Sequence, residues 1–147
     1  MKDFAGTEVK IGDTVAIVYH PEAYKFEVKA AVVVEVKGKQ NMLVTRLINS
    51  ETTASFLPEK DGDVYPRIVK INPNLIKAEE GTLDAVEQAI HIGDRIACRK
   101  PAEAGGNTVK GFELGGKVVS ITDHFVFYID EISGAKKRKG FNSVVVY

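Results

Sequence analysis

Short apolar runs, rich in Val, Ile, Phe and Tyr, alternate along the chain with polar runs that contain Gly, Asp, Asn and Pro. β-Branched and aromatic residues favour strands, and the polar residues between them favour turns. The pattern therefore predicts an almost entirely β protein built of short strands. The apolar runs occupy residues 11–16, 33–36, 42–47, 67–71, 92–97, 118–121, 125–129 and 143–147.

These runs fall into two sets that repeat one another. Ile-Gly-Asp-Thr-Val-Ala at residues 11–16 recurs as Ile-Gly-Asp-Arg-Ile-Ala at residues 92–97. Such self-similarity indicates a duplicated structural unit when several segments recur in the same order. Four further segments do so: residues 26–27 recur at 112–113, 33–36 at 118–121, 42–47 at 125–129, and 67–71 at 143–147.

The repeat predicts two small closed barrels, over residues 1–74 and 91–147, because closure removes sheet edges that so small a unit could not otherwise protect. A unit of this size buries only a marginal core, so we expect the two to pack together.

The connector, residues 75–90, carries an apolar stripe. Thr82 is a suitable helix N-cap, and Leu83, Val86 and Ile90 fall on one face at helical spacing. We therefore predict a short connecting helix. The alternative, a flexible linker, would leave the stripe exposed.

Two long polar segments, residues 20–29 and 100–111, precede the second strand of each unit. Long loops on small β scaffolds often carry the binding function.

Charge is distributed unevenly, although 20 basic and 20 acidic residues cancel over the whole chain. Residues 91–147 contain nine Lys or Arg against six Asp or Glu, whereas residues 77–90 contain four acids and one lysine. A neutral chain is not typical of a strongly basic nucleic-acid binder. A local basic patch remains compatible with phosphate binding through charge and counterion release.

The densest basic run lies between two glycines and predicts a basic loop in the second barrel. Nearby aromatic residues could stack on bases if they are exposed, among them Phe125, Phe127, Tyr128 and Phe141. The competing interpretation is that the charges are merely solvated and the aromatics belong to the core. The residues predicted to bind nucleic acid are Lys136, Lys137, Arg138 and Lys139, with Arg99, Lys100, Lys37, Lys39 and Tyr128.

Catalytic and metal-binding patterns are missing from the sequence. His20, His91 and His124 lie far apart, without a ligand at metal spacing, and the single cysteine, Cys98, has no catalytic motif around it. We therefore predict a protein that is not an enzyme and uses neither metal nor cofactor. We expect Cys98 to be a buried thiol.

No apolar run approaches the roughly 20 residues that span a bilayer. We expect a cytoplasmic protein without a membrane partner.

The Ile-Gly-Asp openings of the two units, with Gly-Lys-Val-Val at residues 116–119, resemble tandem SH3-like barrels of the KOW type. The chain is also similar to small phage-encoded early proteins of the MotB kind, which bind DNA without strong sequence preference. Ala30 and Ala31 stand where the KOW family favours glycine, and both segments before the second strands are long.

Two functions follow as hypotheses. The resemblance and the basic loop imply a nucleic-acid-binding protein, with DNA favoured over RNA, that modulates host transcription or nucleoid proteins. The alternative is a protein-interaction module, such as a phage-encoded inhibitor or adaptor of a host protein. Zero net charge suits the alternative better.

Overall fold

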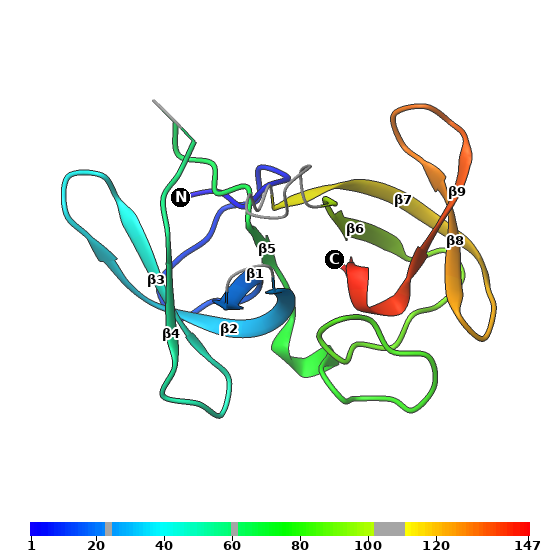
Figure 1. Ribbon diagram of the computed structural model, residues 1–147, viewed down its shortest axis with the longest axis horizontal. Coiled ribbons are helices and arrows are strands. Elements are labelled where there is room, and N and C mark those ends of the chain that lie inside the picture. The colour runs from blue at the N-terminus through cyan, green and yellow to red at the C-terminus, as the bar shows by residue number, and fades with distance from the viewer. Residues whose placement is uncertain (23–24, 60–61, 102–110) are drawn as a thin grey trace.

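The computed structural model describes residues 1–22, 25–59, 62–101 and 111–147, which form two five-stranded antiparallel sheets (Figure 1). The first sheet has the order β4-β3-β2-β1-β5 and the second the order β10-β6-β7-β8-β9. Two 3-10 turns, η1 (Pro73–Leu75) and η2 (Phe141–Ser143), accompany them. The strands are β1 (Thr14–Glu22), β2 (Lys25–Lys37), β3 (Met42–Leu47), β4 (Thr53–Phe56), β5 (Ile68–Lys70), β6 (Arg95–Arg99), β7 (Phe112–Ile121), β8 (Phe125–Asp130), β9 (Lys136–Gly140) and β10 (Val144–Val146).

The two sheets share one topology. If β1 to β5 are matched with β6 to β10, the two strand orders are identical, which confirms the predicted all-β tandem architecture. Both units also carry a register shift at the same place, after Val33 in the pairing of β2 with β3 and after Val118 in that of β7 with β8.

The repeated Gly-Asp turns make the same hydrogen bonds. Gly12 N donates to Val33 O and Gly93 N to Val118 O, both at 2.8 Å. Both glycines have positive φ, 96° and 95°, which only glycine adopts at little cost. The side chain of Asp13 closes its turn by accepting the N–H of Lys10.

One predicted correspondence is displaced by two residues. Phe112 pairs with Arg99, and Val28, not Phe26, pairs with the equivalent Val18. Both Val28 and Phe112 are buried, at 6% and 2% exposure. The sequence match of Phe26 with Phe112 was therefore wrong because burial, and not residue type, is shared at this position.

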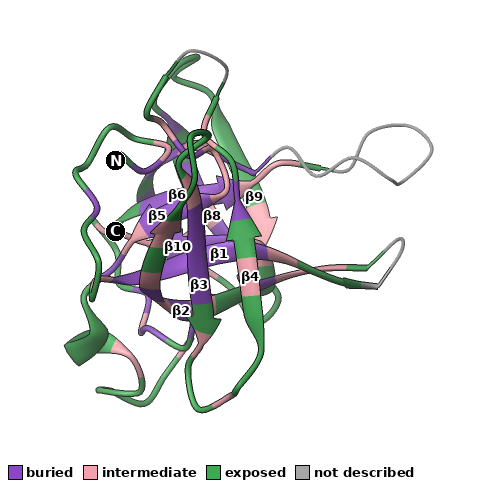
Figure 2. Ribbon diagram, turned by 90° about the vertical axis from the view of Figure 1, so that its left-hand side faces the viewer, coloured by how far each residue is buried: buried purple, intermediate pink, exposed green. Residues whose placement is uncertain are grey.

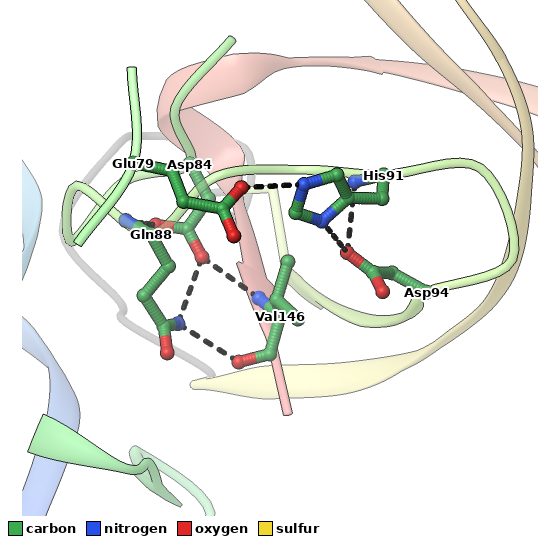
Figure 3. A network of polar contacts seen from close by, with 6 residues as sticks. All are labelled: Glu79, Asp84, Gln88, His91, Asp94 and Val146. Atoms are coloured by element: carbon green, nitrogen blue, oxygen red, sulfur yellow. Dashed lines mark hydrogen bonds and ion pairs between the residues drawn. The ribbon is translucent and has the colours of Figure 1, made fainter. Parts of the chain in front are cut away.

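The predicted helix in the connector is also wrong, because residues 82–90 form a turn around a buried carboxylate (Figure 3). Asp84 accepts the backbone N–H groups of Val86, Gln88 and Val146 and the side-chain amide of Gln88. Burial raises the pKa of the Asp84 carboxyl, and these donors act in the opposite direction. A side chain that binds backbone donors in this way competes directly with helix formation.

Asp3 makes the same arrangement at the start of the chain. It accepts the N–H groups of Ala5, Thr7 and Lys70, at positions equivalent to those bound by Asp84. We call these two turns, residues 1–9 and 82–90, the aspartate clasps. We propose that each unit begins with its clasp, so that the second unit starts near Thr82.

Each clasp covers one edge of its sheet. Phe4 N donates to Ile68 O of β5, and Ala85 N donates to Val144 O of β10, both at 3.0 Å. In the described part of the chain, the opposite edges, β4 and β9, pair with no further strand.

A buried cluster at the centre of the molecule joins the two units. It contains equivalent residues of both: Ala16 with Ala97, and Val69 with Val145. The expectation that the units pack together is thus confirmed, and they do so through equivalent faces. Burying one such Val or Phe side chain is worth about 1.5–3 kcal/mol. Figure 2 shows the buried strands in the interior and the exposed turns around them.

Gly111 lies at a backbone contact between the two units. Phe112 N donates to Pro66 O of the first unit at 2.8 Å. A Cβ on Gly111 would lie 2.2 Å from the same oxygen, and the φ of this glycine is +90°. Only glycine allows this approach of the two backbones.

We expect Gly111→Ala to lower the free energy of unfolding by about 1–2 kcal/mol more than Gly134→Ala, measured by urea denaturation. Gly134 also has positive φ, +73°, but its added Cβ would meet nothing within 4 Å. It therefore reports the backbone strain alone. Equal losses in the two variants would contradict the close approach at Pro66.

Candidate binding surface on the second sheet

The basic run is an edge strand and not the predicted loop. Lys136, Lys137, Arg138 and Lys139 lie in β9, where no side chain is buried. Lysine is depleted in strands overall, so the sequence alone predicts a loop here. It is common on edge strands, where charge discourages unwanted pairing.

Three strands contribute to one exposed face beside this run. On β8, Val126, Tyr128 and Asp130 are buried, and the residues between them face outward. Ile129 pairs with Lys117 of β7 and with Lys136 of β9. Directly opposed residues of neighbouring strands lie on the same face of a sheet. We call this face the β8–β9 outer face; it consists of Lys117, Phe125, Phe127, Ile129, Lys136 and Arg138.

The two phenylalanines of this face are each covered by a cation. The Arg138 guanidinium carbon lies 4.5 Å from the ring centroid of Phe125, and the Lys136 Nζ lies 5.3 Å from that of Phe127. Both rings are only partly exposed. Cation–π contacts of this kind are worth about 0.5–1 kcal/mol at exposed sites, and they hold the cations against the sheet.

Lys137 points to the turn between β8 and β9, where its Nζ lies 2.7 Å from Asp130 Oδ2. Asp130 also accepts the N–H of Ile132 and the hydroxyl of Ser133. The hydrogen bond from Lys137, followed by these two, lowers the pKa of Asp130 to about 2. Lys137 therefore orders the turn and offers less charge to a ligand than its neighbours do.

Tyr128 is buried at 3% exposure, so the prediction that it stacks on a base is wrong. It belongs to the core of the second unit together with Cys98, which is buried as expected, at 1% exposure. Burial, followed by the neighbouring Cys98, raises the pKa of the Tyr128 hydroxyl. The alternation of β8 places Tyr128 on the inner face, opposite to Phe127.

The other predicted site residues lie elsewhere. Arg99 ends β6 and Lys100 follows it, and β7 and β8 separate them from β9. Lys37 ends β2 and Lys39 lies in the turn between β2 and β3, which Figure 1 places at the opposite end of the molecule from β9. Lys37 Nζ also lies 3.7 Å from Glu35. The nine predicted residues thus form no single surface.

The segment before the second unit is tied to its Gly-Asp turn by a histidine (Figure 3). His91 Nε2 lies 2.8 Å from Glu79, and its Nδ1 lies 3.5 Å from Asp94. The hydrogen bond with Glu79 is the largest of the effects that raise the pKa of His91. Glu79, one of the four acidic residues of the connector, therefore has its partner within the chain.

Among residues 1–22, 25–59, 62–101 and 111–147, no group of three or more His, Cys, Asp or Glu side chains is arranged to hold a metal ion. The same residues contain no helix long and apolar enough to cross a membrane.

Of the two polar segments predicted to be loops, the first is mostly strand and most of the second is not described. Residues 20–22 and 25–29 belong to strands β1 and β2, so the first is mainly a strand hairpin. Residues 102–110 of the second lie outside the described residues.

Comparison with known proteins gives few relatives. Residues 1–52 match a family model described as a domain of unknown function, DUF7205. No curated protein matches the chain. Two solved structures are similar, each with 19% identity and a TM-score of 0.36 over 92% of this chain: the AGD34 segment of Arabidopsis thaliana AGDP1, covered to 80%, and tandem Agenet domain 3-4 of ADCP1, covered to 78%.

Sequence reasoning missed two members of the outer face, Lys117 and Ile129. Lys117 lies 19 positions before Lys136 in the sequence, and only the pairing of β7 with β8 and of β8 with β9 brings them into one row. The strand predicted over residues 125–129 was the available signal, because the two-residue period of a strand assigns Phe125, Phe127 and Ile129 to one face.

We expect Lys137→Met to raise the pKa of Asp130 from about 2 toward the ordinary aspartate range, measured by NMR titration of its carboxyl group. A lowered folded-state pKa stabilises the fold above the unfolded pKa of roughly 3.9, and this contribution is lost as the pH falls through about 2. The variant should therefore lose less stability than the wild type between these two pH values.

Lys136→Met is the matched control, since its cation lies over Phe127 and not beside a carboxylate. It should leave the Asp130 titration unchanged. An Asp130 pKa that stays the same in Lys137→Met would contradict the assigned cause.

Proposed function

We propose that this protein is a protein-interaction module that binds an acidic segment of a partner through the β8–β9 outer face. The observation that carries the proposal is the row in which Lys117 and Lys136 flank the exposed Ile129 across three strands. Ile129 is 39% exposed, so the row offers apolar contact between two positive charges.

The surface cations retain their charge for a partner. Among the described residues, no carboxylate lies within ion-pair distance of Lys117, Lys136 or Arg138. The two acidic residues that end β8 and begin the following turn, Asp130 and Glu131, already pair with Lys137 and Arg95. Rim charges of this kind steer an oppositely charged partner and fix its orientation.

The size of the patch favours an acidic protein segment over nucleic acid. A nucleic-acid strand requires a basic track along its backbone and open aromatic faces for its bases. The predicted cations Arg99, Lys100, Lys37 and Lys39 do not extend the patch, and Phe125 and Phe127 are covered by their own cations. A short acidic segment needs neither feature.

The finer parts of the sequence interpretation stay predictions. These are DNA binding with little sequence preference, an action on host transcription or nucleoid proteins, the KOW subfamily, phage origin, the absence of enzymatic activity and a cytoplasmic location.

We expect a hexapeptide of alternating Glu and Val, blocked at both ends, to bind the wild-type protein. Lys136→Ala combined with Arg138→Ala should weaken this binding about tenfold, which corresponds to about 1.4 kcal/mol, because two charged contacts are lost. Fluorescence anisotropy at 50 and 200 mM salt measures the effect.

Lys37→Ala combined with Lys39→Ala removes the same charge from the opposite end of the molecule and should leave peptide binding within twofold of the wild type. Single-stranded DNA is tested in parallel. The nucleic-acid function would replace the proposed one if DNA bound with a steep salt dependence while the peptide did not bind, or if both double variants weakened the binding of DNA alone.

A further inference from the structure

Among the described residues, β9 is an unpaired sheet edge, as β4 is, whereas the edges at β5 and β10 are covered. The aspartate clasps supply backbone partners to β5 and β10, through Phe4 and Ala85. In the described part of the chain nothing equivalent is paired with β9 or with β4. An uncovered edge presents backbone groups to which another strand can bind.

The register identifies which amides of β9 point outward. Asp130 N donates to Ala135 O at 2.9 Å, so this opposed pair is hydrogen-bonded. Bonded and non-bonded pairs alternate along an antiparallel ladder. Lys137 and Lys139, opposite Tyr128 and Val126, therefore bond to β8, and the backbone N–H groups of Lys136 and Arg138 point away from it.

The two residues with outward amides also carry the outward charges. Lys136 and Arg138 are opposite Ile129 and Phe127 and lie with them on the outer face. A strand added at this edge would place every second side chain on the same face, beside these cations. Backbone and side chain therefore favour the same extended ligand.

The edge charges also restrict the choice of partner. A second copy of β9 would bring Lys and Arg opposite Lys and Arg, which is unfavourable in cross-strand pairs. The equivalent edge of the first unit, β4, has Thr53 and Ser55 at the positions of Lys136 and Arg138 and carries no charge there. The charge is thus specific to one of two otherwise equivalent edges.

From this juxtaposition we infer that an extended acidic segment of a partner protein binds as a sixth strand along β9, with its acidic side chains at alternate positions next to Lys136 and Arg138. The inference rests on the proposed function, to which it adds the conformation and the sequence pattern of the partner. Lysines that only blocked the edge would produce no such backbone pairing.

Amide hydrogen exchange of the 147-residue chain, followed by NMR, tests the inference. Addition of the alternating Glu-Val hexapeptide should slow exchange at Lys136 and Arg138 at least about tenfold, since their N–H groups become bonded. Lys137 and Lys139, already bonded to β8, should change less. Thr53 and Ser55 of β4, whose amides also point outward, provide the control within the same molecule.

Two further peptides separate charge from strand pairing. A peptide with the three Glu residues adjacent and the three Val residues adjacent has the same charge without the alternation. A peptide with N-methyl groups on every second residue keeps the charge and the alternation but removes one edge of backbone donors. Both should bind at least about tenfold more weakly than the alternating peptide.

The outcomes are distinguishable. Slowed exchange at Lys136 and Arg138 with weak binding of both control peptides supports strand addition. Equal binding of the three peptides, without slowed exchange at these two amides, would overturn strand addition and leave an acidic-partner function intact. Absence of binding by all three peptides would overturn both.

Discussion

The hydrophobic contact between the two units is the interaction on which the rest of the structure depends. Each unit has a small core of its own, and the central cluster joins them through Ala16, Val69, Ala97 and Val145. The first clasp supplies Phe4 to this region, where its ring packs against Phe112 and Tyr147. This contact uses the faces of β1, β5, β6 and β10 that lie opposite to each unit's own core. The β8–β9 outer face and the distal edges, β4 and β9, therefore remain available for other roles.

The architecture could be predicted from the sequence because the segments of the first unit recur in the second. A single Ile-Gly-Asp segment would have been uninformative, but the ordered recurrence predicted two equivalent β units, and the two sheets do share one strand order. The prediction of a helix in the connector failed for a specific reason. The spacing of Leu83, Val86 and Ile90 is compatible with a helix, yet Asp84 binds the N–H groups of Val86 and Gln88, which a helix would need for its own hydrogen bonds. The alignment of Asp3 with Asp84, both three residues before a Gly or Glu of positive φ, was the overlooked signal.

The candidate surface was predictable only in part. The concentration of charge at residues 136–139 was visible in the sequence. These residues have a low intrinsic preference for strands, however, and they form one because they pair with β8. The sequence also grouped Lys37, Lys39, Arg99 and Lys100 with this run because it gives no distances. The positions of Tyr128 and Lys137 show the same limit, since one residue along a strand separates a side chain that faces solvent from one that contacts the interior or a turn.

The packing of the two units through equivalent faces resembles the contact of a symmetric homodimer, in which the same patch of each subunit meets its counterpart. In a true homodimer every substitution occurs twice, so a basic edge on one subunit is necessarily present on the other. Covalent linkage of the two units removes this obligation. One edge can then become charged while its equivalent stays neutral, and the stoichiometry of binding at such an edge is one partner per chain and not two.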